Sequence, residues 1–545
     1  MKKLFAALLC LMAGVYAIGQ TRQLSGMISD AASNEGITSA TVKVKGKTNS
    51  TATAADGRFT LTVPTGNFTL QVSSVGYGTK EVEVGATDDN LSISLSTSST
   101  ELREVVVTAL GVSKSRKALT SSVTELKTED LTQARTNNIM NGLAGKVAGV
   151  NITSTATGPA GSSRVIIRGN TSISRDNNPL YVIDGIPIDN ANRGSAGEWG
   201  GTDAGDGIQS INPDEVETIT VLKGGQAAAL YGSRASNGVI LITTKKGSKR
   251  KGVGVELNSN IGLEQPTSFT DWQYVYGHGV DGNKPATADD AANLNLNSWG
   301  AKLDGSNVIQ YDGVSRPYVA QKNNMKNFYE TGTTFTNSIA MTGGSDKSTY
   351  YFTMSDLNNK SFIPNSSLRR DNLSLNTTFN PVDKLSINVG IRYIRERVEN
   401  RPKVSDSPGN ANFSVFMLPT SIDVRVLKDA MRNADGSEKK WQGNDYVTNP
   451  YWATDVFKQH DERDRFIGNV EVRYNFTDWL YARGRIGADQ FSLSNFAITP
   501  YGTKYATGGQ LDDQSKATVS EFNGEGIVGA TKSIGSFGID FLAGV

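Results

Sequence analysis

Strict two-residue alternation in the second half of the chain constrains its fold more than any other feature. In one run, polar or small residues separate five apolar ones: Leu385, Ile387, Val389, Ile391 and Tyr393. Similar runs occupy 253–263, 373–379, 466–476 and 480–489. Apolar-out, polar-in alternation over about 10 residues is typical of strands in an outer-membrane β-barrel. A soluble sandwich or solenoid with one wet face would alternate in the same way.

The connections between these runs also alternate in length. Short turns are expected near 343–347, 380–384 and 477–479, whereas 264–333 and 396–464 are long and polar. Short turns on one rim and long loops on the other match the layout of an outer-membrane barrel. We count about nine strands after residue 250. Bacterial barrels normally have an even number of strands, and an open barrel would leave unpaired edge groups in lipid. We therefore expect the chain to be the N-terminal part of a longer protein.

Residues 1–19 have the pattern of a secretory signal peptide. Lys2 and Lys3 precede an apolar stretch, and small residues lie before Gln20. The single cysteine, Cys10, falls inside this segment, so the mature chain has no disulfide framework. No other apolar run approaches the roughly 18 residues of a membrane helix. An exported chain of this kind can still cross a membrane as a β-barrel, which favours the barrel.

Two smaller units precede the alternating half. Residues 22–96 predict seven short strands separated by turn residues such as Asp56 and Gly57, a pattern that favours a β-sandwich. Residues 118–247 predict mixed α/β structure, with helices expected at Asn138–Val147 and Gln226–Tyr231.

The linker between these units, residues 97–117, carries a short strand-forming run. Its flanks are rich in Ser, Thr, Lys and Arg and have little apolar surface to bury. Its centre, Val105–Thr108, is β-branched and favours a strand. A strand-forming run inside a flexible linker suits pairing with the sheet edge of another protein.

Three motifs resemble the plug of SusC/RagA-type TonB-dependent outer-membrane transporters: Pro179–Ile188, Asn212–Gly224 and Ala229–Gly247. The residues that carry this plug signature are Asp184, Gly185, Gly224, Tyr231, Gly232, Arg234, Asn237 and Gly238. Residues 22–96 are similar to the carboxypeptidase-regulatory-like domain of that family. Residues 101–111 resemble its TonB box, in which the residues implied to bind TonB are Glu104, Val105, Val106, Val107, Thr108 and Ala109.

The resemblance implies a mostly β protein with an N-terminal sandwich, an α/β plug and the first strands, about nine, of an incomplete outer-membrane barrel over 252–545. It implies TonB-dependent import of a large nutrient, an oligosaccharide or a peptide. The implied partners are TonB with its inner-membrane motor, a SusD-like surface lipoprotein and outer-membrane lipid. The implied location is the outer membrane, with the N-terminal domain in the periplasm.

A surface receptor, adhesin or signalling protein without transport is the alternative function. Signalling members of the family usually carry an extra domain directly after the signal peptide, and the early start of the sandwich argues against one here.

The sequence offers little catalytic chemistry, and we expect no enzyme, metal site or cofactor. His278 and His460 are far apart and both fall in expected loops. Gly277–Gly282 matches a dinucleotide-binding pattern but lacks the strand–turn–helix setting. Gly200–Gly207 fits a plug loop better than a calcium site, which needs six or more oxygen ligands. A net charge of +1 gives no reason to expect a nucleic-acid partner.

Aromatic residues in the long loops leave two interpretations open. They can stack on sugar or peptide ligands, or they can pack the loops internally. The residues concerned are Trp272, Tyr274, Tyr276, Trp299, Trp441 and Trp452.

Overall fold

The computed structural model describes most of the chain after the expected signal peptide, which lies outside the described residues. It covers 21–545 except 32, 48, 75–76, 97–104, 108–112, 116–122, 133–134, 156, 174–176, 198–199, 225–230, 269, 294–297 and 535–536. The chain divides near residue 105 into two compact units.

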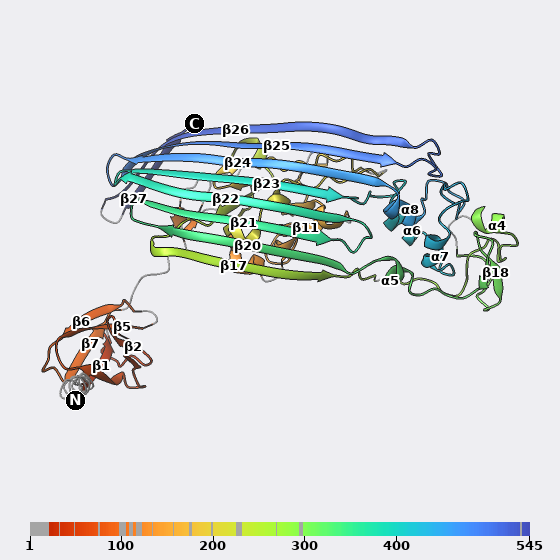
Figure 1. Ribbon diagram of the computed structural model, residues 1–545. Helices are drawn as coiled ribbons and strands as arrows, with labels where there is room; N and C mark the ends of the chain where they lie inside the picture. Colours follow the sequence, from red (N-terminus) through yellow and green to blue (C-terminus); the bar gives the residue numbers. More distant parts are fainter. Residues whose placement is uncertain are drawn as a thin grey trace, which may run out of the picture. The chain divides into compact units, whose positions relative to one another are not determined.

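The first unit is a β-sandwich of seven strands (Figure 1). The strands are β1 (Thr21–Asp30), β2 (Thr41–Val44), β3 (Ser50–Ala52), β4 (Arg58–Pro64), β5 (Phe68–Ser73), β6 (Lys80–Val84) and β7 (Asn90–Leu95). One sheet has the order β4-β1-β7 and the other β3-β2-β5-β6. Alternate residues such as Phe59, Leu61 and Val63 are buried between them. The expected sandwich is confirmed.

The strand expected in the linker is present at its centre. Val105–Val107 forms β8, which pairs with β9 (Ser113–Ser115) in a two-stranded sheet. Glu104, Thr108 and Ala109 lie outside the described residues.

Residues 123–245, called the plug below, contain a five-stranded sheet. Its order is β10 (Val123–Lys127), β15 (Val216–Leu222), β16 (Val239–Thr244), β13 (Leu180–Ile183) and β14 (Ile186–Pro187). A second, two-stranded sheet joins β11 (Val150–Ser154) to β12 (Ser163–Ile167). Among the described residues, the helical pieces with assigned bounds are α2 (Thr128–Thr132) and the 3-10 turns η4 (Asn141–Leu143), η5 (Gly158–Ala160), η6 (Ile208–Ser210), η7 (Pro213–Glu215) and η8 (Gly232–Ala235).

The prediction of a helix at Asn138–Val147 is wrong. Only the short turn η4 forms there, although Ile139, Leu143 and Val147 are buried as their spacing suggested. Gly145 adopts a φ of +76°, which ends any helix at that point. The second expected helix, Gln226–Tyr231, lies almost entirely outside the described residues.

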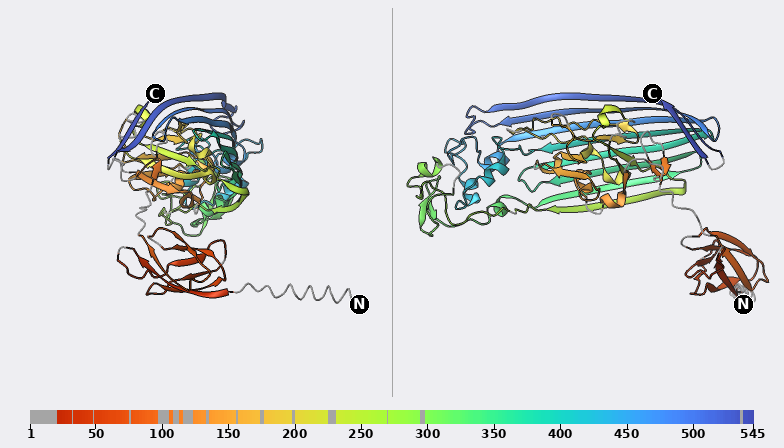
Figure 2. Two further views of the ribbon diagram at one scale, coloured as in Figure 1. Left: turned by 90° about the vertical axis from the view of Figure 1, so that its left-hand side faces the viewer. Right: turned by 180° about the vertical axis from the view of Figure 1, so that it is seen from behind.

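The alternating half folds into one nine-stranded antiparallel sheet in sequential order, called the wall below. Its strands are β17 (Arg250–Glu264), β20 (Gly332–Gly344), β21 (Ser348–Lys360), β22 (Ser367–Val382), β23 (Leu385–Glu399), β24 (Lys458–Asn475), β25 (Leu480–Thr499), β26 (Gln510–Ile534) and β27 (Phe537–Gly544). The wall curves, and the plug lies against its concave face (Figure 2, left). The strand number matches the expectation, but β24 begins early enough that His460 lies in a strand rather than a loop.

The two faces of the wall differ as the alternation predicts. Leu373, Tyr393 and Tyr474 are more than two-fifths exposed on the outer face, whereas Ser374 and Arg392 on the inner face are each 2% exposed. The outer face is apolar and the inner face polar, as in a strand that separates lipid from a polar lumen. Within the described part of the chain, no helix is long and apolar enough to cross a membrane.

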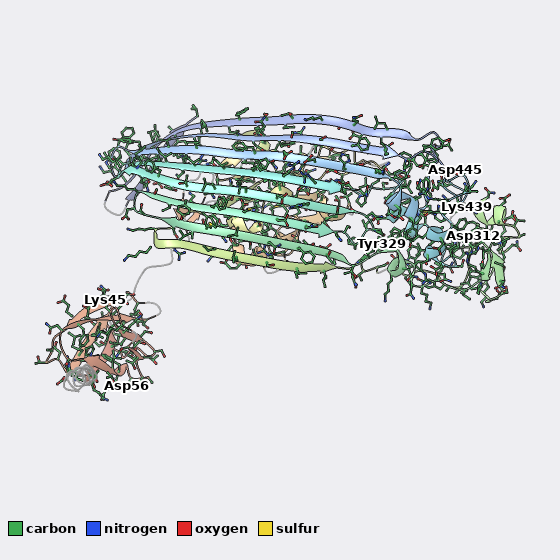
Figure 3. All side chains as sticks on the ribbon, in the orientation of Figure 1. Lys45, Asp56, Asp312, Tyr329, Lys439 and Asp445 are labelled. Carbon is green, nitrogen blue, oxygen red and sulfur yellow. The ribbon has the colours of Figure 1, made fainter. Side chains whose placement is uncertain are left out.

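Two long connections gather beyond one end of the strands, near the labelled Asp312, Tyr329, Lys439 and Asp445 in Figure 3. The first contains α4 (Ala288–Asn293), β18 (Asn307–Ile309), β19 (Ser315–Pro317) and α5 (Asn324–Phe328). The second contains α6 (Ala411–Phe416), α7 (Val424–Asp429) and α8 (Pro450–Asp455). Apolar residues from both connections share one buried cluster, so the two connections pack together. They comprise residues 265–331 and 400–457 and are called the loop cap below.

Candidate functional site: the plug against the wall

The turn at Asp184 and Gly185 has a backbone conformation that favours these two residue types. It joins β13 to β14, with Ile183 paired directly to Ile186. Both turn residues have positive φ, +48° and +86°, as a two-residue hairpin turn of the I′ type requires. Asp tolerates this conformation and Gly adopts it without strain. A Cβ at Gly185 would also overlap the guanidinium of Arg485 on the wall.

This turn carries Asp184 to a buried arginine of the wall. Arg392, on β23, donates to Asp184 Oδ2 at 2.7 Å and to Thr244 Oγ1 at 2.6 Å. Thr244 in turn donates its backbone N–H and its hydroxyl to the Asp184 carboxylate. Glu215 lies 3.5 Å from Arg392 Nε. One cation thus joins three separate plug segments to the wall.

A second contact holds residues 189–207 of the plug. Arg465, on β24, donates to the backbone carbonyls of Gly207 at 2.6 Å and Asp189 at 3.0 Å. Asp489, on β25, binds Arg465 through both oxygens and accepts the N–H of Asp189 at 2.9 Å. Arg465 is 1% exposed, so this ion pair is dry. The wall here recognises the plug main chain rather than its side chains.

Neighbouring wall residues extend this pattern. Arg463 donates to the carbonyls of Ala204 and Asp206 at 3.1 and 3.2 Å. Asn372 donates to the carbonyl of Ser210 at 2.8 Å. Glu396 accepts from Gln209 at 3.0 Å. Residues 204–210 are therefore held by a continuous row of polar contacts.

Two further arginines hold earlier parts of the plug. Arg370 pairs with Glu396 and donates to the carbonyl of Asn137 at 3.0 Å. Arg401 pairs with Asp461 at 2.7 Å and donates to the carbonyl of Ala160 at 2.5 Å. Sequence reasoning named none of these arginines as a site residue. For Arg370, Arg392, Arg463 and Arg465 the available signal was the inward position in a strand, because a charge facing inward needs a buried partner. Arg401 follows the end of β23, so the alternation gave no signal for it.

Carboxylates in the Gly200–Gly207 loop are used to build the loop. Asp203 accepts hydrogen bonds from Thr155, Thr157, the N–H of Ser162, Asn192 and the N–H of Gly205. These donors occupy the oxygens that a cation would need. No group of three or more His, Cys, Asp or Glu side chains within the described residues is placed to hold a metal ion.

The remaining residues of the plug signature are spread through the plug rather than gathered at one site. Gly224, Gly232 and Gly238 all have positive φ, so each supports a backbone turn. Arg234 pairs with Glu521 of the wall at 2.5 Å. Asn237 contacts Thr171 and the carbonyl of Asn178. Tyr231 packs against a buried cluster of the plug.

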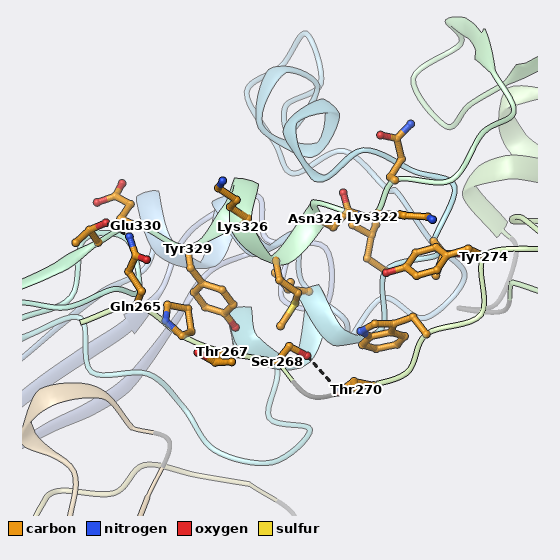
Figure 4. A pocket seen from close by; sticks show the side chains of 18 residues that line it. Gln265, Thr267, Ser268, Thr270, Tyr274, Lys322, Asn324, Lys326, Tyr329 and Glu330 are labelled. Atoms are coloured by element: carbon orange, nitrogen blue, oxygen red, sulfur yellow. Dashed lines mark hydrogen bonds between the residues drawn. The ribbon is translucent and has the colours of Figure 1, made fainter. Parts of the chain in front are cut away.

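The loop cap contains a cavity of about 630 Å³ (Figure 4). Residues from two segments, 265–274 and 321–331, line most of it, and Val415, Leu418 and Thr420 complete the lining. Tyr329 and Tyr274 lie toward its opposite ends. Hydroxyl and amide side chains dominate the lining, which also includes Trp272. A polar cavity with aromatic faces suits a ligand that offers hydroxyl or amide groups and a flat surface.

Outside the cavity, the structure separates the remaining loop aromatics into two groups. Trp441 and Trp452 are 3% and 1% exposed and pack the cap internally. Tyr276 and Trp299 are 41% and 65% exposed, with ring centroids 6.2 Å apart, so they face solvent together. Packing explains the first pair, and the second remains available to a ligand or partner.

His278 is a packing residue of the cap. It is 1% exposed, and its Nδ1 lies 2.8 Å from the Ser421 hydroxyl. Burial lowers the pKa of this imidazole to about 4, so the ring is neutral at physiological pH.

Glu438 makes the cap sensitive to pH. Its buried carboxylate accepts the N–H groups of Asn449 at 2.7 Å and Lys504 at 2.9 Å, and burial raises its pKa to about 7. The folded cap therefore binds a proton more tightly than the unfolded chain. Its stability is greatest below the unfolded pKa of about 4.3 and falls as pH rises through 7.

We expect tryptophan fluorescence to report unfolding of the cap a few degrees higher at pH 5.5 than at pH 8. Glu438→Gln, which carries no charge at either pH, should remove most of this difference. An unchanged pH dependence in that variant would assign the effect to another group.

Comparison with known proteins identifies both small units. The TonB-dependent receptor plug domain matches residues 115–239, and the CarboxypepD_reg-like domain matches 24–107. The TonB-dependent receptor SusC of Bacteroides thetaiotaomicron is 28% identical, over 87% of this chain and 45% of SusC. The TonB-dependent receptor P3 of Formosa agariphila is 26% identical, over 98% of this chain and 48% of that receptor.

Solved structures agree on the fold. The RagAB peptide importer in its open-open state aligns with a TM-score of 0.59 at 19% identity, over 81% of this chain and 48% of that one. The chain spans about half the length of these relatives.

Proposed function

Because the chain is a homologue of SusC-like TonB-dependent receptors, we propose that it imports a large nutrient across the outer membrane by a TonB-driven opening of its plug. The observation that carries this proposal is the plug itself. It lies on the concave, polar face of a wall whose opposite face is apolar. A polar lumen filled by a folded segment needs an energy source to open.

In this proposal the linker is the segment that TonB binds and pulls. Val105–Val107 already has strand conformation and lies in the linker ahead of the plug. Such a strand can leave β9 and pair with a sheet edge of TonB, since backbone hydrogen bonds exchange at little net change in number. TonB would then pull with the inner-membrane proton-motive force through residues 104–109.

The proposed location is the outer membrane, with the sandwich in the periplasm and the loop cap outside the cell. The cap cavity and the Tyr276–Trp299 pair are the proposed contacts for a nutrient or for a SusD-like lipoprotein. An oligosaccharide and a peptide both fit the polar and aromatic lining, and the RagAB relative is named a peptide importer.

Binding of the periplasmic domain of TonB to the purified protein tests whether TonB pairs with the linker strand at 105–107. Calorimetry should detect binding to the wild type and a loss of at least tenfold in affinity for Val106→Pro, because proline removes a ladder hydrogen bond and is excluded from central strands. Ser98→Pro, in the linker ahead of this run, is the matched control and should bind normally. Equal binding by all three proteins would place the TonB contact elsewhere.

A further inference from the structure

We propose that one end of the wall, called the short-turn rim below, selects anionic phospholipids in the periplasmic leaflet of the outer membrane. The short-turn rim comprises residues 245–251 and the turns 345–347, 383–384 and 476–479, at the end of the wall opposite the loop cap (Figure 1). The inference rests on the proposed outer-membrane location, in which the short turns face the periplasm. It concerns which lipid the protein selects rather than which nutrient it imports.

Five of the seven residues at 245–251 are basic. Such a run is often a solvated linker, but here it is held against the protein. The carbonyl of Lys245 accepts a hydrogen bond from Asn376 of the wall at 2.8 Å. A Cβ on Gly247 would lie 2.3 Å from the backbone nitrogen of Tyr350, so the chain passes directly against β21 at that point. The basic run therefore has a fixed place at this end of the wall.

Other lysines continue the positive charge along the same rim. Lys347 and Lys384 are exposed in the turns from β20 to β21 and from β22 to β23. Lys384 donates to the carbonyl of Phe476 at 3.4 Å, and Lys532 Nζ lies 5.2 Å from the ring centroid of Trp479. Both aromatic side chains are exposed at the border of the apolar face. Lysines beside aromatic rings at the end of a membrane strand are placed to reach lipid headgroups.

Few carboxylates are placed to neutralise these cations. Lys249 pairs with Asp346 in the turn from β20 to β21. Asp383 and Asp478 are exposed on the same rim, but neither lies within 4.0 Å of a basic side chain in the part of the chain that the structure describes. The described rim thus has more cations than carboxylates, and this excess attracts an anionic partner.

The border of the apolar face nearest the loop cap has a different charge pattern. Arg369 lies 3.3 Å from Asp356, and Arg397 lies 3.0 Å from Glu462. Arg395 also pairs with Glu462. Charges at this border are therefore neutralised within the protein, whereas most lysines of the short-turn rim have no carboxylate partner among the described residues. The wall thus presents the two leaflets with different charge, and only the periplasmic one meets an excess of cations.

A phospholipid matches this rim in both of its chemical parts. The phosphate of an anionic headgroup supplies the charge that the lysines lack, as for other basic segments beside a membrane. Its acyl chains cover the apolar outer face of the wall, which begins directly beside the lysines. A soluble acidic protein would match the lysines alone and leave the adjoining apolar surface exposed.

Spin-labelled lipids measure this selectivity in the protein reconstituted in phosphatidylcholine vesicles. Labelled phosphatidylglycerol should associate with the protein about fivefold more strongly than labelled phosphatidylcholine, the factor that one lysine near an anionic headgroup contributes. A variant without four exposed lysines should bring this ratio close to one. Its changes are Lys249→Gln, Lys251→Gln, Lys347→Gln and Lys384→Gln.

Arg369→Gln with Arg397→Gln is the matched control, because it removes exposed cations from the opposite border. This variant should keep the wild-type ratio. A ratio near one in the wild type, a ratio that persists in the four-lysine variant, or an equal loss in the control would overturn the proposal.

Photo-crosslinking of the wild type provides a test that no folding defect can obscure. Phosphatidylglycerol with a photoreactive headgroup should mark residues 249–251, 347 and 384, and adducts confined to 369 and 395–397 would contradict the proposal. Neither experiment measures import, so a protein that enters bilayers without lipid selectivity would leave the proposed function intact. A protein that fails to enter bilayers would count against both.

Discussion

Arg465→Ala is expected to lower the free energy of local opening of the plug by about 3–5 kcal/mol, because it leaves the buried carboxylate of Asp489 without its cation. Asp489 is 1% exposed and lies 2.6 Å from Arg465 Nη2. The change also removes the donors to the carbonyls of Gly207 and Asp189. A loss of this size corresponds to more than about a hundredfold in the local opening equilibrium.

Hydrogen exchange read by mass spectrometry measures this effect directly. Amides of residues 204–210 should exchange at least about a hundredfold faster in Arg465→Ala than in the wild type. Arg369→Ala is the matched control, since Arg369 is an exposed wall arginine 3.3 Å from Asp356, and such pairs contribute about 0–1 kcal/mol. Equal hydrogen-exchange protection of residues 204–210 in both variants would show that the buried pair does not hold the plug against the wall.

The double variant Arg465→Leu with Asp489→Leu separates charge from packing. Replacing a whole buried ion pair with apolar residues is often close to neutral. Its protection should therefore lie much nearer the wild type than that of Arg465→Ala. A loss as large as in the single variant would instead assign the stability to the carbonyl contacts.

Strand periodicity predicted the wall well, because a two-residue repeat fixes which side chains face inward whatever the distant contacts are. It placed Arg392 on the inner face, yet gave no indication of its partner. Asp184 lies 208 residues earlier, and no local pattern connects the two positions. The candidate site is therefore visible in the sequence as unpaired inward charges, while its pairing comes only from the fold.

Helix prediction in the plug failed for a local reason. Ile139, Leu143 and Val147 have helical spacing and are all buried, but glycines at 142, 145 and 149 lower helix propensity, and two of them adopt positive φ. Burial of that face is achieved by turns instead. Apolar spacing thus identified core residues correctly while assigning the wrong backbone.

The loops show what residue type alone leaves undecided. Trp452 and Trp299 are both tryptophans in long polar connections, yet one is 1% exposed and the other 65%. Trp452 donates its indole N–H to Thr503, in the connection between β25 and β26. Its burial depends on two connections that are distant in sequence, so only the three-dimensional structure separates packing aromatics from available ones.

Val106→Pro is expected to abolish energised uptake while leaving surface binding intact. In the proposed mechanism TonB would then have no continuous strand at 105–107 to pair with, whereas the loop cap and its cavity would be unchanged. Cells would be offered labelled oligosaccharides, with labelled peptides as a second arm, and whichever pool binds the wild type would be followed.

Transfer of that bound label into the periplasm is the measurement that tests the TonB-driven mechanism most directly. The mechanism predicts transfer in the wild type and in Ser98→Pro, and no transfer above the level of an energy-depleted control in Val106→Pro. Surface-bound label should be equal in all three strains. Continued transfer by Val106→Pro cells that still bind the label normally would contradict it.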